Sequence, residues 1–139
     1  TEIEVYPGDY LGYWQRKGWT DDATIKIFSR IDSPGHYQTL RGPMQHFRGI
    51  AFGGPNSISK VELSFDAGRT WNECEIESPM SPYSWVIWNY NWTPTKPGKF
   101  QTVVRATDTK GQLQIAEIVR PQPAGASGLH TIISEVAEL

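Results

Sequence analysis

The stretch KVELSFDAGRTWNECEI, at residues 60–76, predicts two strands joined by a tight turn. In its first half Val61, Leu63 and Phe65 fall on one face, whereas the residues between them are polar. A period of two is typical of a strand with one buried face. The turn at residues 66–69, Asp-Ala-Gly-Arg, suits a hairpin because Gly adopts positive φ at low cost and Asp accepts hydrogen bonds from nearby backbone N–H groups. We therefore interpret the turn as architectural and not as catalytic.

Strand-like segments recur along most of the remaining chain. The other predicted strands cover residues 24–31, 45–54, 85–92, 99–108, 113–119 and 129–136. Together these make about seven or eight short strands, and they predict an all-β fold in which two antiparallel sheets pack face to face. Residues 1–23 are predicted to be irregular, with one turn of helix at most, because Gly12 and Gly18 disfavour a longer one.

Size and charge exclude several classes of protein. The chain has 139 residues, which suits one domain, and its 13 Lys and Arg against 15 Asp and Glu give a net charge of −2. Without a basic run, the sequence predicts neither nucleic-acid binding nor attachment to an anionic membrane. No apolar run is long enough to cross a bilayer, so no membrane insertion is expected. The cellular compartment is left open.

The residues that most often carry chemistry do not form a recognisable motif. Cys74, the one cysteine, falls on the inner face of a predicted strand, and we interpret it as a buried core thiol. His36, His46 and His130 are far apart in the sequence and match no metal-ligand spacing. Residues 125–128 lack the strand-turn-helix context of a serine nucleophile. We expect no metal site and no catalytic residue in this chain alone.

Four tryptophans, Trp71, Trp85, Trp88 and Trp92, are the most conspicuous feature of the composition. Flat aromatic rings can form a platform for sugars, so a carbohydrate- or surface-binding module is one hypothesis. Aromatic residues are also enriched in cores and at subunit interfaces. Alternation places Trp88 and Trp92 on the same face as Val86, which favours the core or interface interpretation.

Four motifs occur in order between residues 47 and 115: G-x-A-F at 49–52, V-E-L-S-F-D-x-G-x-T-W at 61–71, W-x-x-W at 85–88 and R-A-x-D-x-x-G-x-x-Q at 105–114. In this respect the chain resembles the C-terminal dimerisation domain of molybdenum-cofactor oxidoreductases, the sulfite oxidase and assimilatory nitrate reductase superfamily. The lead-in YLGYWQRKGW resembles the segment that joins the molybdenum domain of such enzymes to this one.

The resemblance implies an immunoglobulin-like β-sandwich at residues 36–139 that forms a homodimer, and a lead-in at residues 1–35 from an upstream molybdenum-cofactor domain. It also implies that molybdopterin and its Cys ligand belong to that upstream domain, and that Cys74 occupies a core position. The substrate and the electron acceptor are left open. Some sulfite-oxidising members carry an Arg before the last strand that reaches the substrate pocket; here Gln122 aligns with it and Arg120 precedes it by two residues. Arg120 is the candidate substrate-pocket residue.

Overall fold

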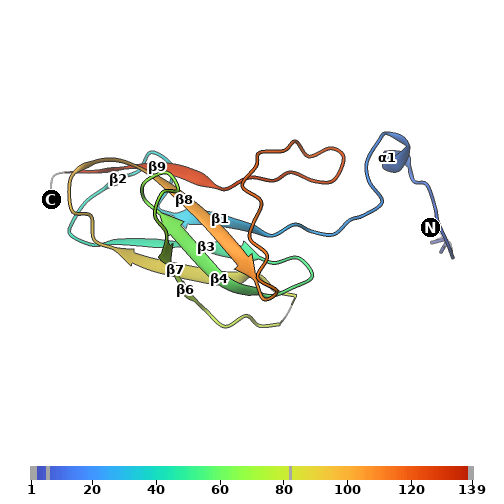
Figure 1. The fold of residues 1–139 in the computed structure, drawn as a ribbon, viewed down its shortest axis with the longest axis horizontal. Helices are drawn as coiled ribbons and strands as arrows, with labels where there is room; N and C mark the ends of the chain where they lie inside the picture. The colour runs from blue at the N-terminus through green and yellow to red at the C-terminus, as the bar shows by residue number, and fades with distance from the viewer. Residues whose placement is uncertain (1–2, 6, 82, 138–139) are drawn as a thin grey trace.

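The computed structural model describes residues 3–5, 7–81 and 83–137, and they form a β-sandwich with a long extension at one end (Figure 1). The helix is one turn, α1 (Tyr13–Arg16). Nine strands are found among the described residues: β1 (Phe28–Ser33), β2 (Thr39–Leu40), β3 (Gln45–Phe52), β4 (Ile58–Ser64), β5 (Asn72–Glu73), β6 (Glu75–Ile76), β7 (Val86–Trp92), β8 (Gly98–Asp108) and β9 (Thr131–Val136). In the part of the chain described, no helix is long and apolar enough to cross a bilayer.

The strands form two sheets, which confirms the predicted all-β sandwich of immunoglobulin type. One sheet has the order β1-β3-β7-β6 and the other has the order β2-β9-β8-β4-β5. Every described pair of named strands is antiparallel except β2 and β9, which run parallel. The parallel pair arises because β2 belongs to the segment between β1 and β3 and covers the edge of β9, the last strand.

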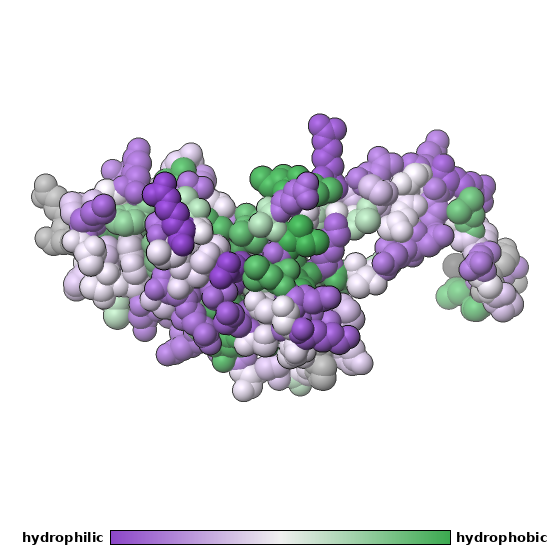
Figure 2. Space-filling view, in the orientation of Figure 1, coloured by the Kyte–Doolittle hydropathy of each residue, from purple (hydrophilic) through white to green (hydrophobic). Residues whose placement is uncertain are grey.

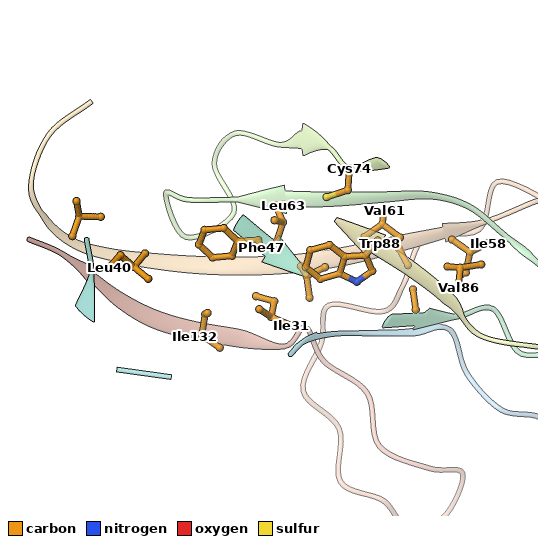
Figure 3. Close-up of a cluster of buried hydrophobic side chains, with 14 residues drawn as sticks. Ile31, Leu40, Phe47, Ile58, Val61, Leu63, Cys74, Val86, Trp88 and Ile132 are labelled. Carbon is orange, nitrogen blue, oxygen red and sulfur yellow. The ribbon is translucent and has the colours of Figure 1, made fainter. Parts of the chain in front are cut away.

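Apolar side chains from both sheets fill the space between them (Figure 3). Phe47, Val61, Leu63 and Trp88 are each fully buried, and they come from β3, β4 and β7. Trp88 packs so tightly on β3 that a Cβ atom at Gly49 would clash with its indole ring and with a carbonyl oxygen of β1. The predicted inward positions of the strongest alternating strands are therefore confirmed.

The predicted strand at residues 70–76 is split between the two sheets. β5 pairs with β4, whereas β6 pairs with β7 of the opposite sheet. Cys74 lies between these two short strands, and its backbone N–H donates to the carbonyl oxygen of Val61 at 2.8 Å. The chain thus crosses from one layer to the other at Cys74, which a continuous alternating pattern does not reveal.

The prediction of a strand at residues 113–119 is wrong. This segment is part of the loop between β8 and β9, which we call the 109–130 loop, and it makes only isolated bridges such as Thr107 with Leu113. Ile118 is 89% exposed. Leu113, Ile115 and Val119 are also exposed, by 38% or more. The buried residue of the segment is Gln114, which is polar.

The sandwich begins at β1, which lies within the predicted lead-in of residues 1–35. β1 pairs with β3 from Phe28 onward, so residues 28–33 are an integral part of a sheet. The described residues before β1 stay outside both sheets, and α1 has no buried residue. We call residues 7–27 the lead-in from here on; Figure 1 shows them extending away from the sandwich.

Candidate interaction surface and site residues

The lead-in and the 109–130 loop lie side by side at one end of the sandwich. Three hydrogen bonds join them: Thr20 N to Pro123 O (3.1 Å), Gln122 Nε2 to Lys17 O (2.8 Å) and Lys26 Nζ to Gly125 O (2.6 Å). Two segments about a hundred residues apart in the sequence are thus held together, mostly through backbone carbonyl groups. These bonds hold the two segments against each other.

A groove of about 1000 Å³ lies between these segments. Its walls include Trp14, Trp19, Ile25, Ile27 and Ile118. The first three and the last are more than a third exposed. Hydrophobic residues gather in this middle part of the molecule, where the loop and the lead-in leave the sandwich (Figure 2). An exposed apolar surface of this kind marks a contact site in soluble proteins.

Gln114 anchors the base of the loop and is buried. Its Oε1 accepts a hydrogen bond from the Ser29 hydroxyl at 2.6 Å and from the Ala106 backbone N–H at 3.2 Å. Its Nε2 donates to the carbonyl oxygen of Gly128 at 3.0 Å. One amide side chain therefore ties both ends of the loop to strands of the two sheets. The sequence contains Gln114 in the R-A-x-D-x-x-G-x-x-Q motif, but nothing in the local pattern indicates this bridging role.

Arg120, the predicted substrate-pocket residue, lies in the same loop and is exposed. It follows Val119, which forms an isolated bridge with Ser127. Gln122, which the sequence analysis expects at the position of the family arginine, is engaged with the lead-in through its contact with Lys17. Arg120 is thus positioned on the loop that also walls the groove, and its role stays a prediction.

Cys74 is buried, as predicted, and its thiol contacts the sandwich interior. Burial raises the pKa of the Cys74 thiol to about 12, and the negative charges of Glu62 and Glu73 act in the same direction. A thiol with so high a pKa is protonated at neutral pH and is a poor nucleophile and metal ligand. The side chain therefore acts as a small apolar core residue.

Two of the three histidines hold backbone groups of the sandwich. His130 Nδ1 accepts a hydrogen bond from the Ile31 N–H at 3.0 Å, and His36 Nδ1 accepts from the Ile133 N–H at 3.0 Å. His46 pairs instead with Asn91 on the outer face of β3 and β7. The structure does not bring the three together, and within residues 3–5, 7–81 and 83–137 no group of three or more His, Cys, Asp or Glu side chains could hold a metal ion.

The four tryptophans do not form a common platform. Trp88 is fully buried, and the ring of Trp92 stacks on Phe65 at a centroid distance of 4.2 Å. The ring of Trp71 is covered by the guanidinium group of Arg105, 4.0 Å away. Trp85 alone of the four is largely exposed, at 59%. The arrangement supports the core interpretation and leaves no row of parallel exposed rings for a sugar.

The hairpin turn quoted at the start is held by Asp66. Its carboxylate accepts hydrogen bonds from the backbone N–H groups of Arg69 and Thr70 and from the hydroxyl groups of Ser64 and Thr70. These bonds, with the Thr70 N–H first, hold the pKa of the Asp66 carboxyl well below its usual range. Gly68 and the preceding residue both have positive φ, which is the geometry that the turn requires. The Asp66 carboxylate therefore stabilises the turn, as the architectural interpretation expects.

The fold resembles that of known domains. The sulfane dehydrogenase SoxCD from Paracoccus pantotrophus matches with a TM-score of 0.64 at 18% identity, over 82% of this chain and 33% of that chain. A CARDB domain from Pyrococcus furiosus matches with a TM-score of 0.54 at 15% identity, over 95% of this chain and 100% of that domain. At these identities the likeness shows the fold alone.

Sequence comparison reaches further. Mitochondrial sulfite oxidase of Rattus norvegicus is 27% identical over 120 residues, which are 76% of this chain and 22% of that enzyme. The NAD(P)H nitrate reductase of Hordeum vulgare is 30% identical over 80 residues, which are 47% of this chain and 9% of that enzyme. The chain thus spans less than a quarter of the length of either relative. The family model of the Mo-co oxidoreductase dimerisation domain matches residues 22–121. This chain belongs to the Mo-co oxidoreductase dimerisation domain family.

Proposed function

We propose that this chain is the assembly domain of a molybdenum-cofactor oxidoreductase and that it pairs two copies of that enzyme. The observation that carries the proposal is the family match over residues 22–121, a range that contains β1 through β8. The fold supports the same role, since its reactive side chains are used for structure: Cys74 fills the core and Asp66 holds a turn. A two-fold pair would use the same surface on both copies.

The groove supports a second contact, with the domain that holds the cofactor in the same enzyme. Its walls come from the lead-in, which the resemblance assigns to the connection with that domain, and from the 109–130 loop. The exposed aromatic rings of Trp14 and Trp19 would be covered there. Arg120 is exposed on the same loop, and we propose that its guanidinium group faces the substrate pocket of that domain, where it would attract an oxyanion.

Molybdopterin itself is proposed to lie in that other domain. The one thiol of this chain does not fit a molybdenum ligand, because Cys74 is buried between the sheets and its pKa is raised to about 12. A ligating thiol must lose its proton and face the metal. No step of an oxidoreductase reaction is therefore assigned to residues of this chain.

Sedimentation equilibrium of the purified chain over a wide range of concentration tests self-association. We expect the fitted mass to rise from that of the 15.7 kDa chain toward twice that value as the concentration increases. A mass that stays monomeric at the highest soluble concentration would contradict pairing by this domain. Elemental analysis of the same sample provides an independent check, because stoichiometric molybdenum would contradict the placement of the cofactor elsewhere.

A further inference from the structure

Apolar side chains cross three neighbouring strands on the outward face of the β1-β3-β7-β6 sheet. Phe28 of β1 pairs with Phe52 of β3, with ring centroids 5.9 Å apart, and Ile50 of β3 pairs with Ile87 of β7. All four side chains are partly exposed. Trp85 directly precedes β7, shares the alternation of Ile87 and is 59% exposed. We call these five residues the sheet-face patch.

Charged residues of both signs border the sheet-face patch. Arg30 and Asp32 form an ion pair of 2.6 Å on β1, and Arg48 of β3 lies 3.6 Å from Glu77, which follows β6. All four side chains are at least 41% exposed. A face with balanced charges can meet an identical face without an excess of like charge, whereas nucleic acid and anionic membranes select a basic surface. The charge pattern therefore favours a second copy of the chain as the occupant.

The outward face of the other sheet carries a network of charged and aromatic groups that is less exposed than these ion pairs. Glu62 accepts a hydrogen bond from Arg105 Nε at 2.8 Å and lies 3.3 Å from the Lys60 ammonium group. The guanidinium group of Arg105 also covers the ring of Trp71. The Glu62 side chain is 12% exposed, so this network is already shielded from solvent without any partner. The Glu62 and Arg105 side chains therefore present less charged surface to a second copy than the ion pairs beside the sheet-face patch do.

The two sheets also differ in how much of each lies within the residues that the family model matches. All four strands of the β1-β3-β7-β6 sheet lie within the matched residues 22–121. The other sheet includes β9, at residues 131–136, which lies outside the match. Part of the groove, at residues 14–20 and 123–130, is likewise outside it, whereas residues 22–29, Gln114 and Ile118 of the groove are inside it. Phe28 of the sheet-face patch also borders the groove. A surface that gives the family its dimerisation should lie within the residues that define the family, and the sheet-face patch does.

We propose that the sheet-face patch is the two-fold interface, so that the β1-β3-β7-β6 sheets of two copies pack face to face. This inference rests on the proposed function, since it assigns a place to the self-association proposed there. Trp85 is the anchor, because an exposed tryptophan near apolar neighbours is a typical interface hot spot. Arg30, Asp32, Arg48 and Glu77 form the polar rim of the contact.

The size of the face can be compared with that of stable interfaces. Its three longer strands have six to eight residues and β6 has two, so with strands about 4.8 Å apart the face covers roughly 350 Å² in projection. Standard stable interfaces bury about 800 Å² on each partner. The sheet alone therefore supports a weak dimer, strengthened where the loop that carries Trp85 adds to the contact.

The test compares Trp85→Glu with Ile118→Glu in sedimentation equilibrium of the full chain. Both changes place a carboxylate at an exposed apolar position, one on the sheet-face patch and the other in the groove. We expect Trp85→Glu to raise the dimer dissociation constant at least about tenfold, and Ile118→Glu to change it less than about twofold. Asn89→Arg is a second variant, on β7 between Arg48 and Glu75 in the register of the sheet, and it should weaken the dimer in the same way.

The outcomes separate the location of the interface from self-association itself. Loss of the dimer in Ile118→Glu alone, in all three variants or in none of them would overturn the sheet-face assignment and leave self-association standing. A wild-type chain that is monomeric throughout would overturn both. Circular dichroism and thermal melting of each variant check that it is folded. If Trp85→Glu is unfolded, Asn89→Arg tests the location of the interface in its place.

Discussion

The sandwich and the segments outside it bury apolar residues in opposite ways. In the sandwich, alternation turns large side chains inward, and Trp88 and Phe47 are fully buried. In the lead-in and the 109–130 loop, Trp14 is 63% exposed and Ile118 is 89% exposed. Stability must therefore come from the sandwich, because only buried apolar area is removed from water. The exposed segments leave their apolar side chains accessible at the surface.

The largest expected effect is the loss of folding stability when a core residue of the sandwich is replaced. Trp88→Ala should lower the free energy of unfolding by about 3–5 kcal/mol, since it leaves a cavity between the sheets. Trp88→Phe should cost less, because it keeps part of the ring and removes an indole N–H that has no hydrogen-bond partner among the described residues. Urea unfolding of both variants measures these losses. A cost below about 1 kcal/mol for Trp88→Ala would contradict a rigid core at this position.

The next largest effect is a loss of folding stability when Gln114, which joins the sandwich to the 109–130 loop, is replaced. Gln114→Ala should lower the free energy of unfolding by about 1–3 kcal/mol, because it leaves the Ser29 hydroxyl and the Ala106 N–H without their partner. Amide hydrogen exchange in residues 115–129 should also increase. Gln112→Ala is the matched control, since the Gln112 side chain is exposed in the same loop. Equal losses in the two variants would argue against Gln114 as the anchor.

A smaller effect depends on pH. Burial lowers the pKa of His130 from its ordinary value of 6.5, and the positive charge of Arg30 adds to this. The unfolded chain therefore takes up a proton at higher pH than the folded chain does, so the His130 contribution is complete above pH 6.5 and is lost as the pH falls through the folded pKa. Protonation of Nδ1 would also remove the acceptor for the Ile31 N–H.

Urea midpoints measured across this pH range for the wild type and for His130→Asn test that account. Asn places a non-titrating oxygen near the position of Nδ1, so its stability should fall less steeply on acidification. The comparison also subtracts every pH-dependent contribution that both proteins share. Parallel pH curves for the two proteins would show that His130 does not contribute.

The smallest expected effect is the change in folding stability when an exposed residue of the lead-in is replaced. Trp14→Ala should change the free energy of unfolding by less than about 0.5 kcal/mol, since α1 has no buried residue. The same substitution is thus expected to be severe at Trp88 and nearly neutral at Trp14. Urea unfolding under identical conditions measures both. A loss above about 1 kcal/mol at Trp14 would mean that the lead-in belongs to the stable core.

The turn at Asp66 and the alternation of β4 could be predicted because a few adjacent residues decide them. The error at residues 113–119 has the opposite cause. An apolar run predicts a strand only if another strand pairs with it, and that depends on residues elsewhere in the chain. The same limitation applies at Cys74, where each half of one alternating run pairs with a different sheet.

The candidate surfaces could not be predicted from short stretches of sequence. The groove forms only because residues near 20 and near 123 come together, and the bridging role of Gln114 depends on three partners from separate segments. Family motifs indicated the type of domain, and alternation put Trp88 on the core face, but neither could distinguish which outward residues of the neighbouring strands lie beside Trp85. That distinction requires the register of β7 against β3.

The sequence by itself determined the class of fold, its inward-facing residues and the family, because periodicity, turn residues and ordered motifs are properties of short stretches of chain. The tertiary structure alone decided which strands share a sheet, where the chain changes layers and which apolar residues stay exposed. These depend on the pairing of backbone groups and side chains distant in the sequence, and their energies are fixed only when the whole sandwich assembles.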